Sequence, residues 1–307
     1  MIEGQEGVSW EQWVALARAC EESGIEGLFR SDHYQSVFDI PGRGSLDAWA
    51  TLAGLAAVTE RIRLGTMVSP TTFRRPSVLS RMVATVDHIS DGRVELGLGG
   101  GWNVSEHEAH GFPFPDLGER MEILAEQLEI VHRQWTEDEF SFEGRHYRLK
   151  RCRAEPKPLQ RPHPPLIMGG AAGPRAAQLA ARWADEYNTP FATPDDCRER
   201  RAGIVEACER AGREPIVFSL MTVCIVGRDP REVLDRVGRW MEVTGRDDDP
   251  AVLLGQEDKL VGTVEEVVAR LRLYAEAGVE RVFLQHLDHA DVDMVRLIGA
   301  ELVPALC

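Results

Sequence analysis

Strand patterns and helix patterns alternate along almost the whole chain, and this alternation constrains the fold more than any other feature. Short apolar runs predict strands at residues 25–30, 62–68, 94–98, 166–168, 186–189, 216–226 and 281–285. Helical patterns predict a first helix from a cap at Ser9 to Gly24, then helices at 46–58, 77–89, 119–135, 174–183, 195–211, 230–243, 264–277 and 292–302. A repeating strand–helix order predicts parallel strands joined by right-handed crossovers.

Two α/β architectures have this order: an open doubly wound sheet and a (β/α)8 TIM barrel. The open sheet is typically marked by a GxGxxG turn after its first strand, but Trp102 takes the last glycine position of the GLGGGW run. We therefore predict a barrel, as one domain over residues 1–307. Its first strand has only residues 1–3 available, so it is either short or truncated, and the native chain could start upstream of Met1. Residues 244–258 are expected to form an insertion before the last strand–helix unit.

Composition and charge exclude several classes of function. The net charge is −15, which argues against nucleic acids and anionic membranes as partners. No apolar run approaches the ~20 residues of a membrane helix, and the first residues do not resemble a signal peptide. The six cysteines have no CxxC spacing. A cytoplasmic protein that binds a small-molecule substrate fits these features best.

Glycine-rich turns follow two of the predicted strands. The sequence is RLGT at residues 63–66 and RVELGLGGGW at residues 93–102. Glycine lets a main chain approach a flat or phosphorylated ligand closely. Because the active sites of TIM barrels lie at the carboxyl ends of the strands, these turns predict an enzyme with a cofactor across that mouth.

Seven segments, taken in order, resemble the bacterial luciferase-like superfamily, and most closely its coenzyme F420-dependent oxidoreductases. They are FRSDHY at 29–34, LGTMVSP at 64–70, the run at 93–102, EHEAHG at 106–111, IMGG at 167–170, and the closing VGTVEEV and RVFLQH at 261–267 and 281–286. The resemblance implies a (β/α)8 barrel that binds a flavin or deazaflavin at its mouth.

The resemblance also implies roles for particular residues. A non-proline cis peptide backing the cofactor ring would fall at Met67–Val68. The remaining expected cofactor contacts are Ser69, Gly100, Gly101, Trp102, Gly169 and Gly170. In the members that oxidise sugar phosphates, a glutamate acts as general acid where this chain has Trp102, so sugar-phosphate oxidation is disfavoured. The helix starting near Pro174 is expected to help bind phosphate through its free N–H groups.

Asp32 and His33 match an Asp-His pair of the family and are the candidate catalytic residues. A histidine beside a carboxylate can take the proton of an alcohol that gives up hydride, although the pair could instead tie down its loop. No metal site is expected, because His107 and His110 are three residues apart rather than in HExxH spacing.

Three functions remain open from the sequence. The first is an F420-dependent oxidoreductase, the second an FMN-dependent luciferase-like monooxygenase, and the third a non-catalytic ligand-binding barrel. The expected cofactor is coenzyme F420, with FMN as the alternative, and a homodimer is the expected assembly.

Overall fold

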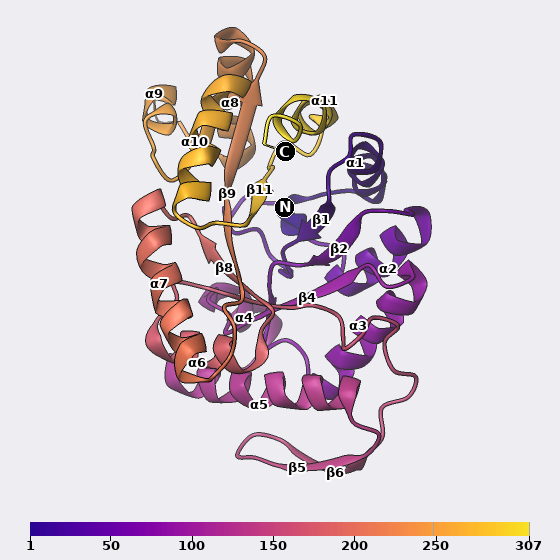
Figure 1. The fold of residues 1–307 in the computed structure, drawn as a ribbon. Helices are drawn as coiled ribbons and strands as arrows, with labels where there is room; N and C mark the ends of the chain where they lie inside the picture. Colours follow the sequence, from indigo (N-terminus) through magenta and orange to yellow (C-terminus); the bar gives the residue numbers. More distant parts are fainter. Residues whose placement is uncertain (248, 307) are drawn as a thin grey trace.

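The computed structural model describes residues 1–247 and 249–306, which form a barrel of parallel strands surrounded by helices (Figure 1). Consecutive strands pair in parallel around the barrel, which confirms the predicted fold class. In sequence order the strands are β1 (Gly27–Arg30), β2 (Arg63–Thr66), β4 (Val94–Gly99), β7 (Leu166–Gly169), β8 (Glu186–Pro190), β9 (Val217–Gly227) and β11 (Arg281–Gln285).

The barrel is closed by a single residue, Ile2, which takes the place of a first strand. Ile2 forms parallel bridges to Arg30 at the end of β1 and to His286 just after β11. Its amide donates to the Phe29 carbonyl at 2.9 Å. The sequence left open whether the first strand is short or truncated. In the structure one residue is enough to link the first and last long strands.

The helices cover the outside of the barrel (Figure 1). The first helix begins where the sequence predicted, because Ser9 accepts from the Gln12 amide and the Gln12 side chain accepts from the Ser9 amide. The helices are α1 (Trp10–Glu22), α2 (Ala48–Val58), α3 (Pro76–Ser90), α4 (Val104–His110), α5 (Leu117–Thr136), α6 (Pro174–Trp183), α7 (Pro194–Arg210), α8 (Pro230–Thr244), α9 (Pro250–Leu254), α10 (Val264–Glu276) and α11 (Val292–Leu297), with short helices at Gly4–Glu6 and Ile298–Leu302. An antiparallel hairpin, β5 (Phe140–Glu143) and β6 (Arg148–Cys152), projects away from the barrel (Figure 1).

The insertion before the last strand–helix unit is larger than predicted and contains a strand that the sequence reading missed. Strand β10 (Leu260–Thr263) pairs in parallel with the distal half of β9, from Cys224 to Gly227, while the proximal half of β9 pairs with β11. Thr263 also caps α10, so the strand passes into the helix without a turn. Because a four-residue strand with no turn signal after it gives little periodicity, the pattern did not reveal it.

The strand predicted at residues 62–68 ends two residues earlier than expected. Strand β2 ends at Thr66, a cis peptide joins Met67 to Val68, and the two-residue strand β3 (Ser69–Pro70) then pairs with β4. The cis peptide lies at the bond that the family resemblance indicated.

The barrel interior explains one glycine of the opening motifs. A Cβ atom at Gly65 would lie too close to the Phe29 ring and to the Glu95 carbonyl. Gly65 is therefore required by the packing of Phe29 inside the barrel, and not by the approach of a ligand, as the sequence reading had assumed.

A buried ionic cluster lies at the amino ends of the strands, at the opposite end of the barrel from the mouth. Arg281 donates to Glu95 at 2.7 Å and to Glu186 at 3.0 Å, and Arg63 also pairs with Glu95. The Arg281 guanidinium is flanked by the rings of Phe29 and Phe283. These charges are paired within the barrel, as buried charges must be.

In the part of the chain that the structure describes, every helix is too short or too polar to span a lipid bilayer. The single domain, the homodimer and the cytoplasmic location expected from the sequence stay predictions.

Candidate active site

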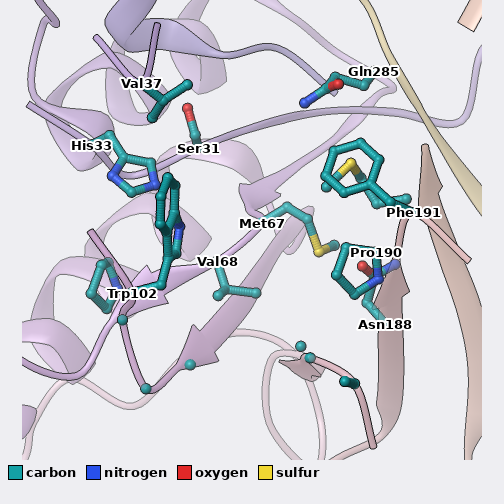
Figure 2. Close-up of a pocket in the computed structure, with 18 of the residues that line it drawn as sticks. Ser31, His33, Val37, Met67, Val68, Trp102, Asn188, Pro190, Phe191 and Gln285 are labelled. Atoms are coloured by element: carbon teal, nitrogen blue, oxygen red, sulfur yellow. The ribbon is translucent and has the colours of Figure 1, made fainter. Parts of the chain in front are cut away.

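A cavity of about 1060 Å³ opens at the carboxyl ends of the barrel strands. Its walls come from the segments after β1, β2, β4, β7 and β8, from Met221 and Val223 of β9, and from the end of β11. The carboxyl ends of the strands are where TIM barrels carry their active sites. Figure 2 shows side chains from several of these segments converging on one space. The volume lies at the upper end of the roughly 300–1,000 Å³ that small-molecule and cofactor sites enclose.

Most of the residues predicted from the sequence line this cavity. The lining includes His33, Met67, Val68, Gly100, Gly101, Trp102, Gly169 and Gly170. The structure thus brings together residues from four separate loops of the chain. Whether they bind the expected cofactor stays a prediction.

Asp32 and Ser69 are the two predicted site residues that lie outside the lining. Asp32 is buried behind it and accepts from the Ser69 hydroxyl at 2.6 Å and from Arg74. Arg74 also donates to Asp47 at 2.8 Å. The arrangement ties the loop after β1 to strand β3, so Asp32 supports the cavity wall rather than facing a ligand.

The carboxylate that contacts His33 is Glu106 of α4, not the neighbouring Asp32. The His33 Nδ1 lies 2.6 Å from Glu106 Oε2. The second oxygen of Glu106 accepts from the backbone amides of Tyr34 and Gln35. Glu106 therefore fixes both the ring of His33 and the loop that carries it, and leaves Nε2 as the ring nitrogen available to the cavity.

The proximity of Glu106 changes the protonation of His33. Burial disfavours a charged ring, but the hydrogen bond to Glu106 and the negative charge of that carboxylate outweigh burial, so the pKa of His33 is raised above its ordinary value of 6.5. Burial opposes ionisation of Glu106 as well, yet the same contact with His33 lowers the pKa of Glu106. The pair is a carboxylate and a readily protonated imidazole.

A second buried carboxylate, Glu6, holds the next part of the same loop. It accepts from the Ser36 hydroxyl at 2.7 Å, from the Val37 amide at 2.9 Å and from Arg43 at 3.1 Å. Each of these bonds joins residues about 30 or more positions apart in the chain. The loop over the cavity is thereby held at both ends by carboxylates that local sequence patterns do not reveal.

The glycines of the cavity offer backbone surface to a flat or anionic ligand. A Cβ atom at Gly100 would meet one atom, the Met121 sulfur at 3.8 Å, and one at Gly173 would meet nothing within 4 Å. Helix α6 begins beside them with Gly173 as an N-cap that makes no side-chain hydrogen bond, and Arg175 in its first turn lines the cavity. Free N–H groups at a helix start, with an arginine beside them, favour an anion.

His107, which together with His110 was not expected to bind a metal, has both ring nitrogens engaged. Nδ1 lies 2.6 Å from the Asn103 carbonyl and Nε2 lies 2.6 Å from the Thr72 hydroxyl. Since the carbonyl can only accept, Nδ1 donates to it, and Nε2 is engaged by the Thr72 hydroxyl. His107 therefore fixes the loop between β4 and α4. Across residues 1–247 and 249–306, no cluster of three potential metal ligands is found.

Three further residues of the cavity wall were not predicted from the sequence. Glu3 lies beside the closing residue Ile2, Asn188 lies within β8, and Phe191 follows that strand. Gln285, which the sequence placed at the end of the last strand and facing the pocket, lines the cavity and donates to Glu3 at 2.6 Å. Position on or just after a strand was the available signal for Asn188 and Phe191, whereas a one-residue strand gave none for Glu3.

One family model and several known proteins match this chain along most of its length. The family model described as luciferase-like monooxygenase matches residues 2–281. An uncharacterized protein of Mycobacterium tuberculosis (strain ATCC 25618 / H37Rv) is 34% identical over 84% of this chain and 92% of its own length. The F420-dependent glucose-6-phosphate dehydrogenase of Microbacterium testaceum (strain StLB037) is 28% identical over 93% of this chain and 90% of its own length.

A solved structure has the same fold. Monooxygenase RslO1 from Streptomyces bottropensis superposes with a TM-score of 0.82, covers 97% of this chain and 94% of its own, and is 24% identical. At that identity the likeness concerns the fold alone, and it agrees with the barrel described above.

Proposed function

Because the chain belongs to the luciferase-like monooxygenase family, we propose that it is a coenzyme F420-dependent oxidoreductase acting on a small organic substrate. Membership of this family indicates an enzyme, either an oxidoreductase or a monooxygenase. The observation that carries the finer proposal is a proton-handling pair, His33 and Glu106, beside a glycine-lined cavity. The F420-dependent relative from Microbacterium testaceum supports the same cofactor.

The residues present fit a deazaflavin. Met67 and Val68 offer an apolar surface to a flat ring, and the open backbone at Gly100 leaves room for its close approach. The start of α6 with Arg175 suits the phosphate of the side chain. When bound, the deazaflavin would supply or accept the hydride, and the protein would orient the substrate and handle the proton.

His33 is the group in this cavity best suited to move that proton. Nδ1 is held by Glu106, so the transferable proton would be carried on Nε2. In carbonyl reduction Nε2 gives its proton to the carbonyl oxygen, and in alcohol oxidation neutral Nε2 takes the hydroxyl proton. The raised pKa keeps more of the ring protonated near neutral pH, which favours the reducing direction there and oxidation at higher pH.

The Glu106→Gln variant is expected to lower the pKa of His33 below 6.5, because the charge that raises it is lost while burial remains. The measurement is NMR titration of the His33 ring in both proteins. In wild type the ring should titrate above 6.5, and carbonyl reduction should fall as the pH rises through the measured pKa of His33. The glutamine keeps an oxygen for the amides of Tyr34 and Gln35. An unchanged midpoint in the variant would rule out Glu106 as the cause.

Wild-type protein should bind coenzyme F420 more tightly than FMN when the two are titrated side by side by fluorescence quenching. Gly100→Val should weaken F420 binding about tenfold or more, since its side chain would fill the space that the ring needs. Gly44→Ala is the control, because a Cβ atom there meets nothing within 4 Å and Gly44 is not among the residues that line the cavity. Tighter binding of FMN would instead support an FMN-dependent monooxygenase. If the protein bound neither F420 nor FMN, the proposed function would be wrong.

A further inference from the structure

The rim of the cavity carries unusually exposed apolar side chains. Trp102 is 62% exposed, Leu117 is 61% exposed and Phe191 is 45% exposed. All three line the cavity, and we refer to them as the apolar rim. Trp102 and Leu117 are the most exposed large apolar side chains among the residues that the structure describes. Large exposed apolar groups gathered around one opening indicate a binding surface rather than chance exposure.

The apolar rim has two aromatic faces on opposite sides of the opening. Figure 2 shows Trp102 beside His33 on one side and Phe191 on the other, with Met67 between them. The rings of His33 and Trp102 meet edge to face with their centroids 5.5 Å apart. This contact covers little of the indole, so a large part of its surface stays open to the cavity next to the proton-handling histidine.

The walls below the rim are apolar as well. They include Val37, Phe38, Met221, Val223, Trp240 and Leu287. The cations that reach the same part of the cavity already have contacts: Lys259 pairs with Asp258 at 3.2 Å, and the Arg246 guanidinium lies over the Trp240 ring at 5.7 Å. This half of the cavity therefore suits an apolar, flat molecule better than a sugar phosphate.

We propose that the enzyme takes flat aromatic ketones or alcohols, stacked on Trp102 and extending toward Phe191. This substrate class rests on the proposed oxidoreductase function. Stacking on the indole would place an oxygen-bearing carbon attached to the ring near His33, where the proton is handled. Trp102 is then the residue that sets specificity for aromatic substrates.

The test uses two ketones that differ in aromaticity, 2-acetonaphthone and 2-octanone, titrated into the protein by calorimetry without cofactor. Wild type should bind 2-acetonaphthone more tightly. Trp102→Leu should weaken binding of 2-acetonaphthone about fivefold and barely change 2-octanone, since an aromatic pair adds a modest amount beyond area burial. Trp102→Phe should recover most of the loss. Trp10→Leu is the matched control, because Trp10 is exposed on α1 away from the cavity.

The outcomes separate the two proposals. If wild type fails to bind 2-acetonaphthone, or if Trp102→Leu weakens both ketones equally, the aromatic subsite is wrong. If 2-acetonaphthone binds as expected but F420 does not bind, the subsite stands and the proposed cofactor is wrong. If F420 binds and hydride passes only to or from glucose 6-phosphate or 2-octanone, the oxidoreductase proposal stands and the aromatic substrate class is overturned.

Discussion

Replacing His33 with alanine is expected to lower turnover by a factor of about 100 to 10,000, the usual contribution of a positioned proton-transfer group. Affinity for the cofactor should change little, because the flat surface at Met67–Val68 and the start of α6 are untouched. Two quantities are measured in wild type and in the variant: the kcat of carbonyl reduction, with 2-acetonaphthone as the first ketone tried, and the Kd of the cofactor. A large loss confined to kcat would place His33 in the chemistry.

Two further variants make this result specific. His33→Asn keeps a donor for Glu106 but cannot exchange a proton near neutral pH, so it should be as slow as the alanine variant. His88→Ala removes an exposed histidine on α3, outside the cavity, and should leave turnover unchanged. If asparagine restored activity, His33 would serve only to fix its loop through Glu106.

Replacing Arg281 with alanine is expected to lower the free energy of unfolding by about 3–5 kcal/mol. Arg281 neutralises Glu95 and Glu186, whose side chains are 3% and 7% exposed, and its removal would leave Glu186 without a cation. Burial already raises the pKa of Glu186, against the opposing charge of Arg281. Urea unfolding followed by circular dichroism measures the loss.

The pH dependence of this loss provides an internal check. Without Arg281 the pKa of Glu186 should rise further, so the defect should shrink as the pH falls and the buried carboxyl is protonated. Arg148→Ala is the matched control: Arg148 pairs with Glu143 at 2.6 Å on the exposed hairpin, and its loss should cost at most about 1 kcal/mol. If the two substitutions had equal effects, burial would not decide how much these ion pairs contribute to the free energy of unfolding.

Features carried by local patterns were predictable from the sequence. The alternation of strands and helices gave the barrel, and the rule that barrel sites lie at strand carboxyl ends placed His33, Gly100 and Gly170 at one mouth. The helix cap at Ser9 was read correctly, because its cause lies within four residues. Both the cis bond at Met67–Val68 and the general identity of the site came from family resemblance, not from periodicity.

Features that depend on distant contacts were not predictable in this way. The sequence placed a carboxylate beside His33 and took it to be Asp32, but the barrel carries Glu106, 73 residues away, to the ring and turns Asp32 toward Ser69. It assigned the glycine of the RLGT motif to ligand approach, whereas the Phe29 ring requires it.

Sequence alone therefore determined the fold class and the end of the barrel where the chemistry belongs, since both follow from hydrophobic period and chain direction. Tertiary structure decided which side chains meet. Strand register and loop path bring Glu106 to His33, Arg281 to Glu95 and Glu186, and Trp102 and Phe191 to opposite sides of one opening. These pairings depend on three-dimensional distance, which the spacing of residues along the chain does not record.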